Sequence, residues 1–90
     1  MTEELKTDVI VRNSLGLHAR PAAMIAKLAM SATGNIWLTV GNETVDATSI
    51  IDILSLACMD GTRLTIEVES TSDIDILKQI RSLFEKGFDE

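Results

Sequence analysis

Hydrophobic and polar residues alternate along four short stretches of this chain, as expected for strands that bury one face of a sheet. The predicted strands are Lys6–Asn13, Ile36–Val40, Glu43–Asp46 and a fourth that follows the turn at Asp60-Gly61. The side chains expected on their buried faces are Val9, Val11, Ile36, Leu38, Val40, Leu64, Ile66 and Val68. Gly41-Asn42 is a tight-turn signal, so the third strand should return antiparallel to the second.

Between these stretches, apolar residues recur with the three- and four-residue spacing of a helix face. Helices are predicted over Ala19–Ser31, from Ser49 to about Cys58, and from Ser72 to Lys86-Gly87. The positions expected to face the core are Ala22, Ile25, Ala26 and Ala29 in the first helix and Ile76, Leu77, Ile80, Leu83 and Phe84 in the last. We expect Ser72-Asp73 to supply a side-chain cap to the last helix.

The predicted order of elements is βαββαβα, with one amphipathic face on each element. Elements of this kind bury their apolar faces by forming two layers. We therefore expect an α+β open-faced sandwich, in which three helices cover one face of a four-stranded antiparallel sheet. Ninety residues have room for one small domain, so residues 1–90 are expected to form a single unit.

The composition argues against several classes of function. A net charge of −6 and only 3% aromatic residues disfavour nucleic-acid binding, which uses basic patches and stacking rings. One histidine and one cysteine are too few for a zinc site or an internal disulfide, and we expect neither a metal nor any other cofactor. The charged stretch Met1–Lys6 lacks the apolar core of a signal peptide, and no apolar run could span a membrane. These features predict a soluble, cytoplasmic protein.

The candidate chemistry lies where the first strand gives way to the first helix. His18 and Pro21 are the only histidine and proline of the chain, and Arg20 lies between them. Proline suits a first helical turn, where its missing N–H has no intrahelical partner. The free amides of that turn, on Ala19 and Arg20, can therefore point at an anion. The arrangement predicts a seat for a phosphoryl group, with His18 as nucleophile and Arg20 as the stabilising charge.

Three segments of the chain resemble a known family. The segment Gly16-Leu17-His18-Ala19-Arg20-Pro21-Ala22 resembles the active-site segment of the HPr family, the histidine-containing phosphocarrier proteins of the bacterial phosphotransferase system. Ser49–Leu56 is similar to the regulatory-serine helix of that family, and Asp60-Gly61-Thr62 matches the turn before its last strand. Together these segments extend from Gly16 to Thr62.

The resemblance implies a phosphocarrier rather than a self-sufficient enzyme. His18 would accept a phosphoryl group from Enzyme I, as a pros-phosphohistidine, and pass it to sugar-specific enzyme II A components. Arg20 and the backbone N–H groups of Ala19 and Arg20 would bind the phosphate. The resemblance also implies the open-faced sandwich already predicted, and we expect the protein to act as a monomer.

An exposed apolar patch beside His18 is predicted from the outward faces of the first two helices. Ile50, Ile53 and Leu56 can fill the core side of the short second helix, which leaves others outward. The predicted docking residues are Ala23, Met24, Lys27, Ile50, Ile51 and Leu54. Apolar patches of this kind mark partner surfaces, although Met24 and Leu54 could instead finish the edge of the core. The resemblance implies that Enzyme I and the acceptor proteins dock here.

Ser49 is expected to be the N-cap of the second helix, with Thr48 as a competing cap. The resemblance implies a regulatory role as well, in which a serine kinase phosphorylates Ser49 and a phosphorylase reverses the reaction. A phosphate at a helix N-terminus is compatible with the fold. Its charge would lie beside the apolar docking patch and weaken the binding of partners.

The sequence also departs from common patterns of the family. Thr48 and Asp52 flank Ser49 where many members carry lysines, and Ala57 replaces a common glycine. The lead-in Asn13-Ser14-Leu15-Gly16 resembles the nitrogen-related branch as much as the sugar branch. Two alternatives to a sugar-uptake carrier therefore stay open: a regulatory carrier of a nitrogen-related relay, and a non-catalytic domain that binds a small ligand or anion.

Overall fold

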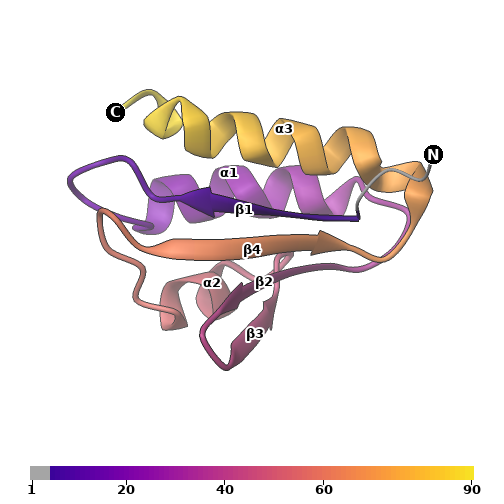
Figure 1. Cartoon of the computed structure of the whole chain (residues 1–90), viewed down its shortest axis with the longest axis horizontal. Coiled ribbons are helices and arrows are strands. Elements are labelled where there is room, and N and C mark those ends of the chain that lie inside the picture. The colour runs from indigo at the N-terminus through magenta and orange to yellow at the C-terminus, as the bar shows by residue number, and fades with distance from the viewer. Residues whose placement is uncertain (1–4) are drawn as a thin grey trace.

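The computed structural model describes residues 5–90, so the first four residues of the charged N-terminal stretch lie outside the description. Four strands and three α-helices follow one another in the predicted order (Figure 1). Their bounds are β1 (Lys6–Ile10), α1 (Ala19–Met30), β2 (Ile36–Val40), β3 (Glu43–Asp46), α2 (Ile50–Ser55), β4 (Arg63–Val68) and α3 (Ile74–Glu85). Short 3-10 turns precede and follow α3, at Thr71–Asp73 and Gly87–Asp89.

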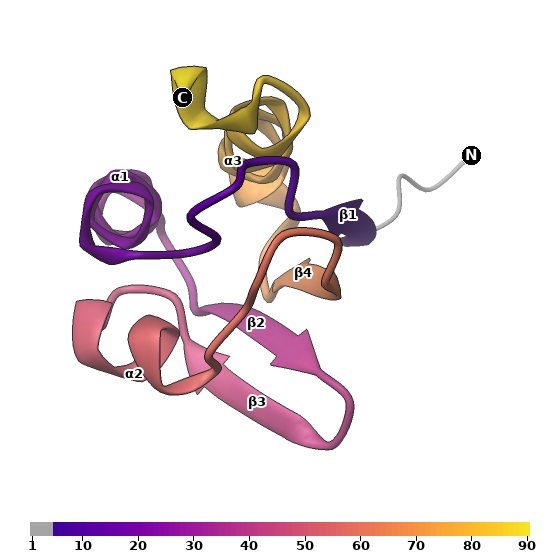
Figure 2. The ribbon, with the colours of Figure 1, turned by 90° about the vertical axis from the view of Figure 1, so that its left-hand side faces the viewer.

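The strands form one sheet in the order β1-β4-β2-β3, and each neighbouring pair is antiparallel. Figure 2 shows the sheet nearly edge-on, with α1, α2 and α3 on one side of it and none of the described helices on the other. This is the predicted open-faced sandwich. The register pairs Val9 with Leu64 and Leu38 with Ile66, so the alternating apolar positions of neighbouring strands share the face that the helices cover.

The core lies between that face and the helices. Every apolar position predicted for the inner face of α1 is buried, as are Leu77, Ile80 and Phe84 of α3. Ile76 and Leu83 are only partly buried, because they lie at the edges of the apolar stripe of α3 rather than at its centre. The predicted buried stripe therefore contained two residues, Ile76 and Leu83, that are not fully buried.

Two elements end three residues earlier than the apolar pattern predicts. β1 ends at Ile10 rather than Asn13, because Val11 pairs with the turn before β4. The Val11 N–H donates to the Thr62 carbonyl at 2.9 Å, and the Val11 carbonyl accepts from the Gly61 N–H at 2.8 Å. α2 ends at Ser55 rather than Cys58, because Ala57 adopts a φ of +52°. That left-handed conformation favours glycine, in line with the glycine that the resembled family commonly carries at this position.

The start of α3 differs from the predicted cap. Ser70, not Ser72, caps the 3-10 turn, accepting a hydrogen bond from the Ser72 N–H. Asp73 precedes α3 but makes no capping bond. Its carboxylate instead accepts from the N–H groups of Thr33 at 2.8 Å and Gly34 at 2.7 Å, in the loop that joins α1 to β2. Asp73 is 2% exposed, so it ties two distant segments together inside the fold.

Asp73→Asn should lower the melting temperature at neutral pH by several degrees, because an amide cannot accept both backbone bonds with a full negative charge. These two backbone bonds are also the largest causes that hold the pKa of Asp73 below its usual range. A lowered folded-state pKa stabilises the fold above the unfolded pKa of about 3.9, and this contribution disappears as pH falls through the folded pKa. Melting curves of parent and variant should therefore converge in acid. Asp75→Asn, on the exposed side of α3, should leave the melting temperature nearly unchanged.

Candidate functional site

His18 lies at the end of the molecule where the loop after β1 meets α1 (Figure 1). It is the N-cap residue of α1, with extended backbone and no side-chain capping bond. Leu17 anchors the preceding loop to the rest of the fold. Its N–H donates to the Cys58 carbonyl at 2.9 Å, and its side chain is buried. Gly16 makes this close approach possible at a φ of +69°. The imidazole is thereby held at the surface on an anchored loop.

The helix N-terminus offers the predicted free amides. The first helical hydrogen bond runs from the Ala22 N–H to the His18 carbonyl, and Pro21 has no N–H to offer. Across residues 5–90, the backbone N–H groups of Ala19 and Arg20 donate to no acceptor. The structure therefore brings His18, Arg20 and two unpaired donors to the positive end of one helix, where an anion is stabilised.

Glu90 also lies at this site, and the sequence analysis missed it. Both of its carboxylate oxygens are 2.9 Å from Nε2 of His18. Nη1 of Arg20 donates to the same carboxylate at 3.1 Å and to the Phe88 carbonyl at 2.9 Å. The pKa of Glu90 is lowered, mainly by the hydrogen bond from His18. The hydrogen bond from Arg20 is the second largest cause that lowers it. Glu90 is therefore a carboxylate that pairs with both predicted site residues.

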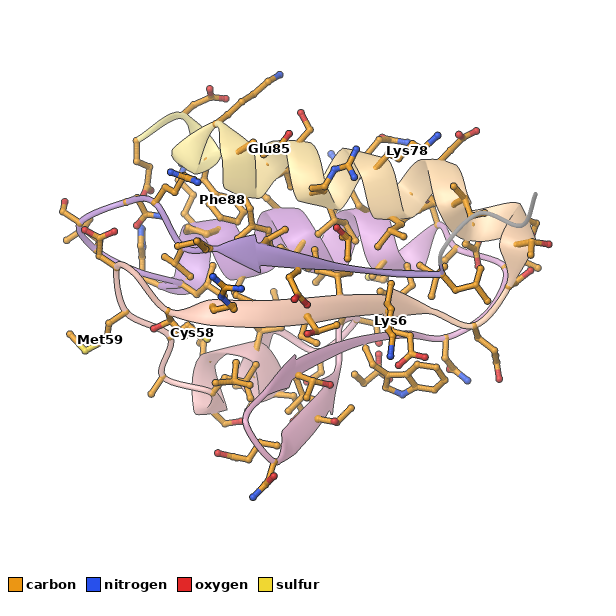
Figure 3. The ribbon with its side chains drawn as sticks, viewed as in Figure 1. Lys6, Cys58, Met59, Lys78, Glu85 and Phe88 are labelled. Carbon is orange, nitrogen blue, oxygen red and sulfur yellow. The ribbon has the colours of Figure 1, made fainter. Side chains whose placement is uncertain are left out.

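The turn after α3 explains how Glu90 reaches a residue 72 positions earlier in the chain. Gly87, at a φ of +60°, ends the helix and reverses the chain. Phe88 then turns inward and is fully buried, with its ring edge-to-face against Phe84 at a centroid distance of 4.9 Å. Figure 3 shows Phe88 beneath the end of α3. The signal available in the sequence was an aromatic residue directly after the glycine that ends the helix.

The predicted docking residues lie on the two helices that Figure 2 shows side by side. Ala23 and Lys27 are exposed on α1, and Met24 is half-buried. On α2, Ile51 is 75% exposed and Leu54 is 37% exposed, whereas Ile53 is buried. Ile50 was also expected to help fill the core side of its helix, and that is wrong: as the first residue of α2 it is 39% exposed.

Two exposed apolar residues near the same loop were not predicted as part of this surface. Leu15 precedes His18 in the loop and is 70% exposed, and Met59 is 72% exposed. Figure 3 shows Met59 projecting outward at the His18 end of the molecule. The sequence contains no local periodicity at either position, because both lie in loops. We call six of the exposed apolar residues the apolar rim; they are Leu15, Ala23, Ile50, Ile51, Leu54 and Met59.

Ser49 is the N-cap of α2, as predicted. Its Oγ accepts a hydrogen bond from the Asp52 N–H at 3.1 Å. Thr48 does not compete for the cap, because its N–H and hydroxyl both donate to the carboxylate of Asp46, at 2.9 and 2.7 Å. These two bonds lower the pKa of Asp46. Ser49 is half-buried and lies directly before the exposed residues of α2.

Other kinds of site find little support in the part of the chain that is described. Among residues 5–90, no three His, Cys, Asp or Glu side chains gather in a group that could hold a metal ion. No helix there combines the length and the apolar character that a membrane crossing needs. Burial raises the pKa of the Cys58 thiol, which disfavours the reactive thiolate.

Comparison with known proteins identifies relatives over most of the chain. The family model described as the PTS HPr component phosphorylation site matches residues 5–86. The phosphocarrier protein HPr of Chlamydia pneumoniae is 34% identical over 88 residues, which cover 98% of this chain and 82% of that protein. The phosphocarrier protein NPr of Klebsiella oxytoca is 33% identical over 87 residues, covering 96% of this chain and 97% of that one. The crystal structure of HPr from Thermoanaerobacter tengcongensis superposes with a TM-score of 0.88 at 32% identity, over 94% of this chain and 96% of that one.

Proposed function

The chain belongs to the HPr family of phosphocarrier proteins of the phosphotransferase system, and we propose that His18 is the residue that carries the phosphoryl group. The observation that supports this role is the convergence at one helix end of an imidazole, a guanidinium and two unpaired backbone N–H groups. A phosphoryl group brings negative charge and acceptor oxygens, and this end of α1 supplies the matching donors. The protein is a carrier, and its partners supply the rest of the transfer machinery.

The geometry favours Nδ1 as the phosphorylated atom. Nε2 is occupied by the Glu90 carboxylate, whereas Nδ1 has no hydrogen-bond partner among the described residues. The free amides of Ala19 and Arg20 would bind the phosphate oxygens. Arg20 has guanidinium donors left over after its bonds to Glu90 and Phe88, and these can reach an added anion. Transfer of this kind depends on position and charge neutralisation rather than on further covalent steps by the protein.

The test of this function is phosphate uptake by the purified chain. Incubation with Enzyme I and labelled phosphoenolpyruvate should add one phosphate per chain, and the linkage should be labile in acid and stable in base, as a phosphoramidate is. No incorporation would contradict the carrier role. An acid-stable linkage would show that the phosphate resides on a hydroxyl rather than on His18.

The partners proposed for the carrier are Enzyme I as donor and enzyme II A components as acceptors. They would dock on the apolar rim and on the neighbouring Met24 and Lys27 of α1. Leu15 precedes His18 in the same loop, and Met59 follows Cys58, whose carbonyl accepts from the Leu17 N–H. A partner bound to these residues would therefore lie beside the imidazole. We also propose that the protein acts in the cytoplasm as a monomer, because a relay carrier must leave one partner before it meets the next.

A carrier of the nitrogen-related relay is the second candidate. It is favoured by the likeness to the NPr of Klebsiella oxytoca, at 33% identity over 96% of this chain. The lead-in Asn13–Gly16 is compatible with this candidate, since it resembles the nitrogen-related branch as much as the sugar branch. Offering the phosphorylated protein equal amounts of a sugar-specific and a nitrogen-related acceptor would decide between the branches. Faster discharge to the nitrogen-related acceptor would overturn the assignment to sugar uptake.

Ser49 is proposed as a regulatory phosphorylation site, served by a serine kinase and phosphorylase. Ser49→Asp should keep the helix cap, since aspartate is a good N-cap that suits the helix dipole. The added charge lies beside Ile50 and Ile51, where an approaching partner must desolvate it. We expect a severalfold higher KM of Enzyme I for the variant, with kcat nearly unchanged because His18 chemistry is untouched.

The matched control is Ser49→Asn, which has the same shape and capping ability without the charge. Its melting temperature and KM should both resemble those of the parent. An equal rise in KM for the aspartate and asparagine variants would trace the effect to the lost hydroxyl. A normal KM for Ser49→Asp would remove α2 from the docking surface.

A further inference from the structure

The imidazole of His18 is engaged on one nitrogen and open on the other. Nε2 lies 2.9 Å from each oxygen of the Glu90 carboxylate, and Nδ1 is without a partner in the described chain. The Glu90 side chain is 18% exposed and the His18 side chain 35% exposed, so the contact is partly shielded from water. A contact to one specific ring nitrogen determines where the ring proton resides.

We propose that Glu90 is a positioning residue for phosphoryl transfer, which holds the proton of His18 on Nε2 and thereby keeps Nδ1 as the nucleophile. An ionised carboxylate accepts hydrogen bonds but donates none. It therefore selects the neutral ring that carries its proton on Nε2, and leaves the lone pair of Nδ1 free. This inference rests on the proposed role of His18 as the phosphoryl acceptor.

The same contact stabilises the charge that develops during transfer. The Nδ1 lone pair forms a bond to phosphorus while the bond between phosphorus and the donor breaks, and that electron pair leaves with the donor. The Nε2 proton stays on the ring, so the ring becomes a positively charged phosphoimidazolium beside the Glu90 carboxylate. In the reverse direction the protonated ring is the leaving group, so the pairing acts on both transfers of the relay.

The surroundings of Glu90 hold its carboxylate in this place. Nη1 of Arg20 donates to Oε2 at 3.1 Å and to the Phe88 carbonyl at 2.9 Å, which ties Glu90 to the turn after α3. Phe88 anchors that turn in the core. Arg20 therefore has two tasks in the proposal: it fixes the carboxylate that orients the ring, and it offers its remaining donors to the phosphate.

Glu90→Gln is the variant that tests the proposal, because a carboxamide can accept from Nε2–H or donate to a bare Nε2 and so selects neither tautomer. In the parent chain, ring 15N chemical shifts of neutral His18 should show a protonated Nε2 and a bare Nδ1. In the variant they should report a mixture of both tautomers. Phosphorylation of His18 by Enzyme I should become roughly tenfold slower, by analogy with the loss of activity when the outer hydrogen-bond partner of a metal-binding histidine is removed.

Asp89→Asn is the matched control, since it removes the neighbouring negative charge at a position whose left-handed backbone, at a φ of +61°, asparagine accepts. It should leave tautomer and rate unchanged, and melting curves should show both variants folded. Retention of the Nε2–H tautomer in Glu90→Gln, or a phosphorylation rate within twofold of the parent, would overturn the proposal. Failure of the parent chain to accept phosphate would count against the proposed function instead, and the tautomer measurement, which needs no phosphate, would still judge Glu90.

Discussion

His18→Ala should fold normally and accept no phosphate from phosphorylated Enzyme I. The imidazole is the only one in the chain, so no second nitrogen nucleophile of this type can replace it. Its side chain is 35% exposed, makes no capping bond and lies outside the core, so the fold has little need of it. Labelled phosphate bound per chain is the measurement, with a melting curve to show that the variant is folded.

Arg20→Ala tests whether Arg20 stabilises the phosphate rather than acting as the nucleophile, and we expect this variant to be slow but not inactive. It removes a charge-assisted contact worth roughly 1.5–3 kcal/mol, which corresponds to about one to two decades in rate. Because the Arg20 guanidinium is half-exposed, we expect the loss in phosphorylation rate to be at the low end of this range, about tenfold. His18→Ala should therefore be inactive where Arg20→Ala is only slow. Normal incorporation in His18→Ala would transfer the carrier role to another residue.

The elements of this fold could be predicted from the sequence because their signals are local. Val9 and Val11, or Ile25 and Ala29, reveal a buried face through spacing within one strand or one helix. Asp73 could not be placed in the same way. Its position before the last helix is typical of a capping residue, but Thr33 and Gly34 bind its carboxylate across 40 and 39 positions of sequence. Only the packing of α3 beside the end of α1 creates that partnership.

The candidate site likewise combines residues that a local pattern predicts with one that only a long-range contact brings in. His18, Ala19 and Arg20 are neighbours in sequence, so one strand-to-helix junction was enough to predict that they act together. Glu90 reaches them only because Phe88 turns into the core after Gly87 reverses the chain. A glutamate in an acidic stretch has no feature of its own that distinguishes it from a solvated charge. Its role depends on a contact 72 positions away, which the tertiary structure supplies.

Gly16→Ala should be the most damaging small substitution in the loop that carries His18. A Cβ at Gly16 would lie 2.4 Å from the Cys58 carbonyl oxygen and 3.0 Å from Cα of Met59, and both are backbone atoms. The left-handed φ of +69° adds about 1–2 kcal/mol for any residue with a Cβ. Overpacking typically costs a further 1–3 kcal/mol, so we expect the free energy of unfolding to fall by roughly 3 kcal/mol. Denaturant unfolding at neutral pH measures this loss.

Phosphorylation should suffer as well, because the carbonyl that meets the new Cβ is the acceptor that anchors Leu17 beside His18. Displacing that anchor moves the imidazole away from the free amides, and a shift of about 1 Å can cost about a hundredfold in rate. Gly41→Ala is the matched control: its φ of +58° carries the same backbone strain, but nothing lies within 4 Å of its Cβ. It should lose only about 1 kcal/mol and keep the parent's rate of phosphorylation. Equal losses of stability in the two variants would show that the Cys58 carbonyl yields easily, and that the loop does not depend on this close approach to hold His18.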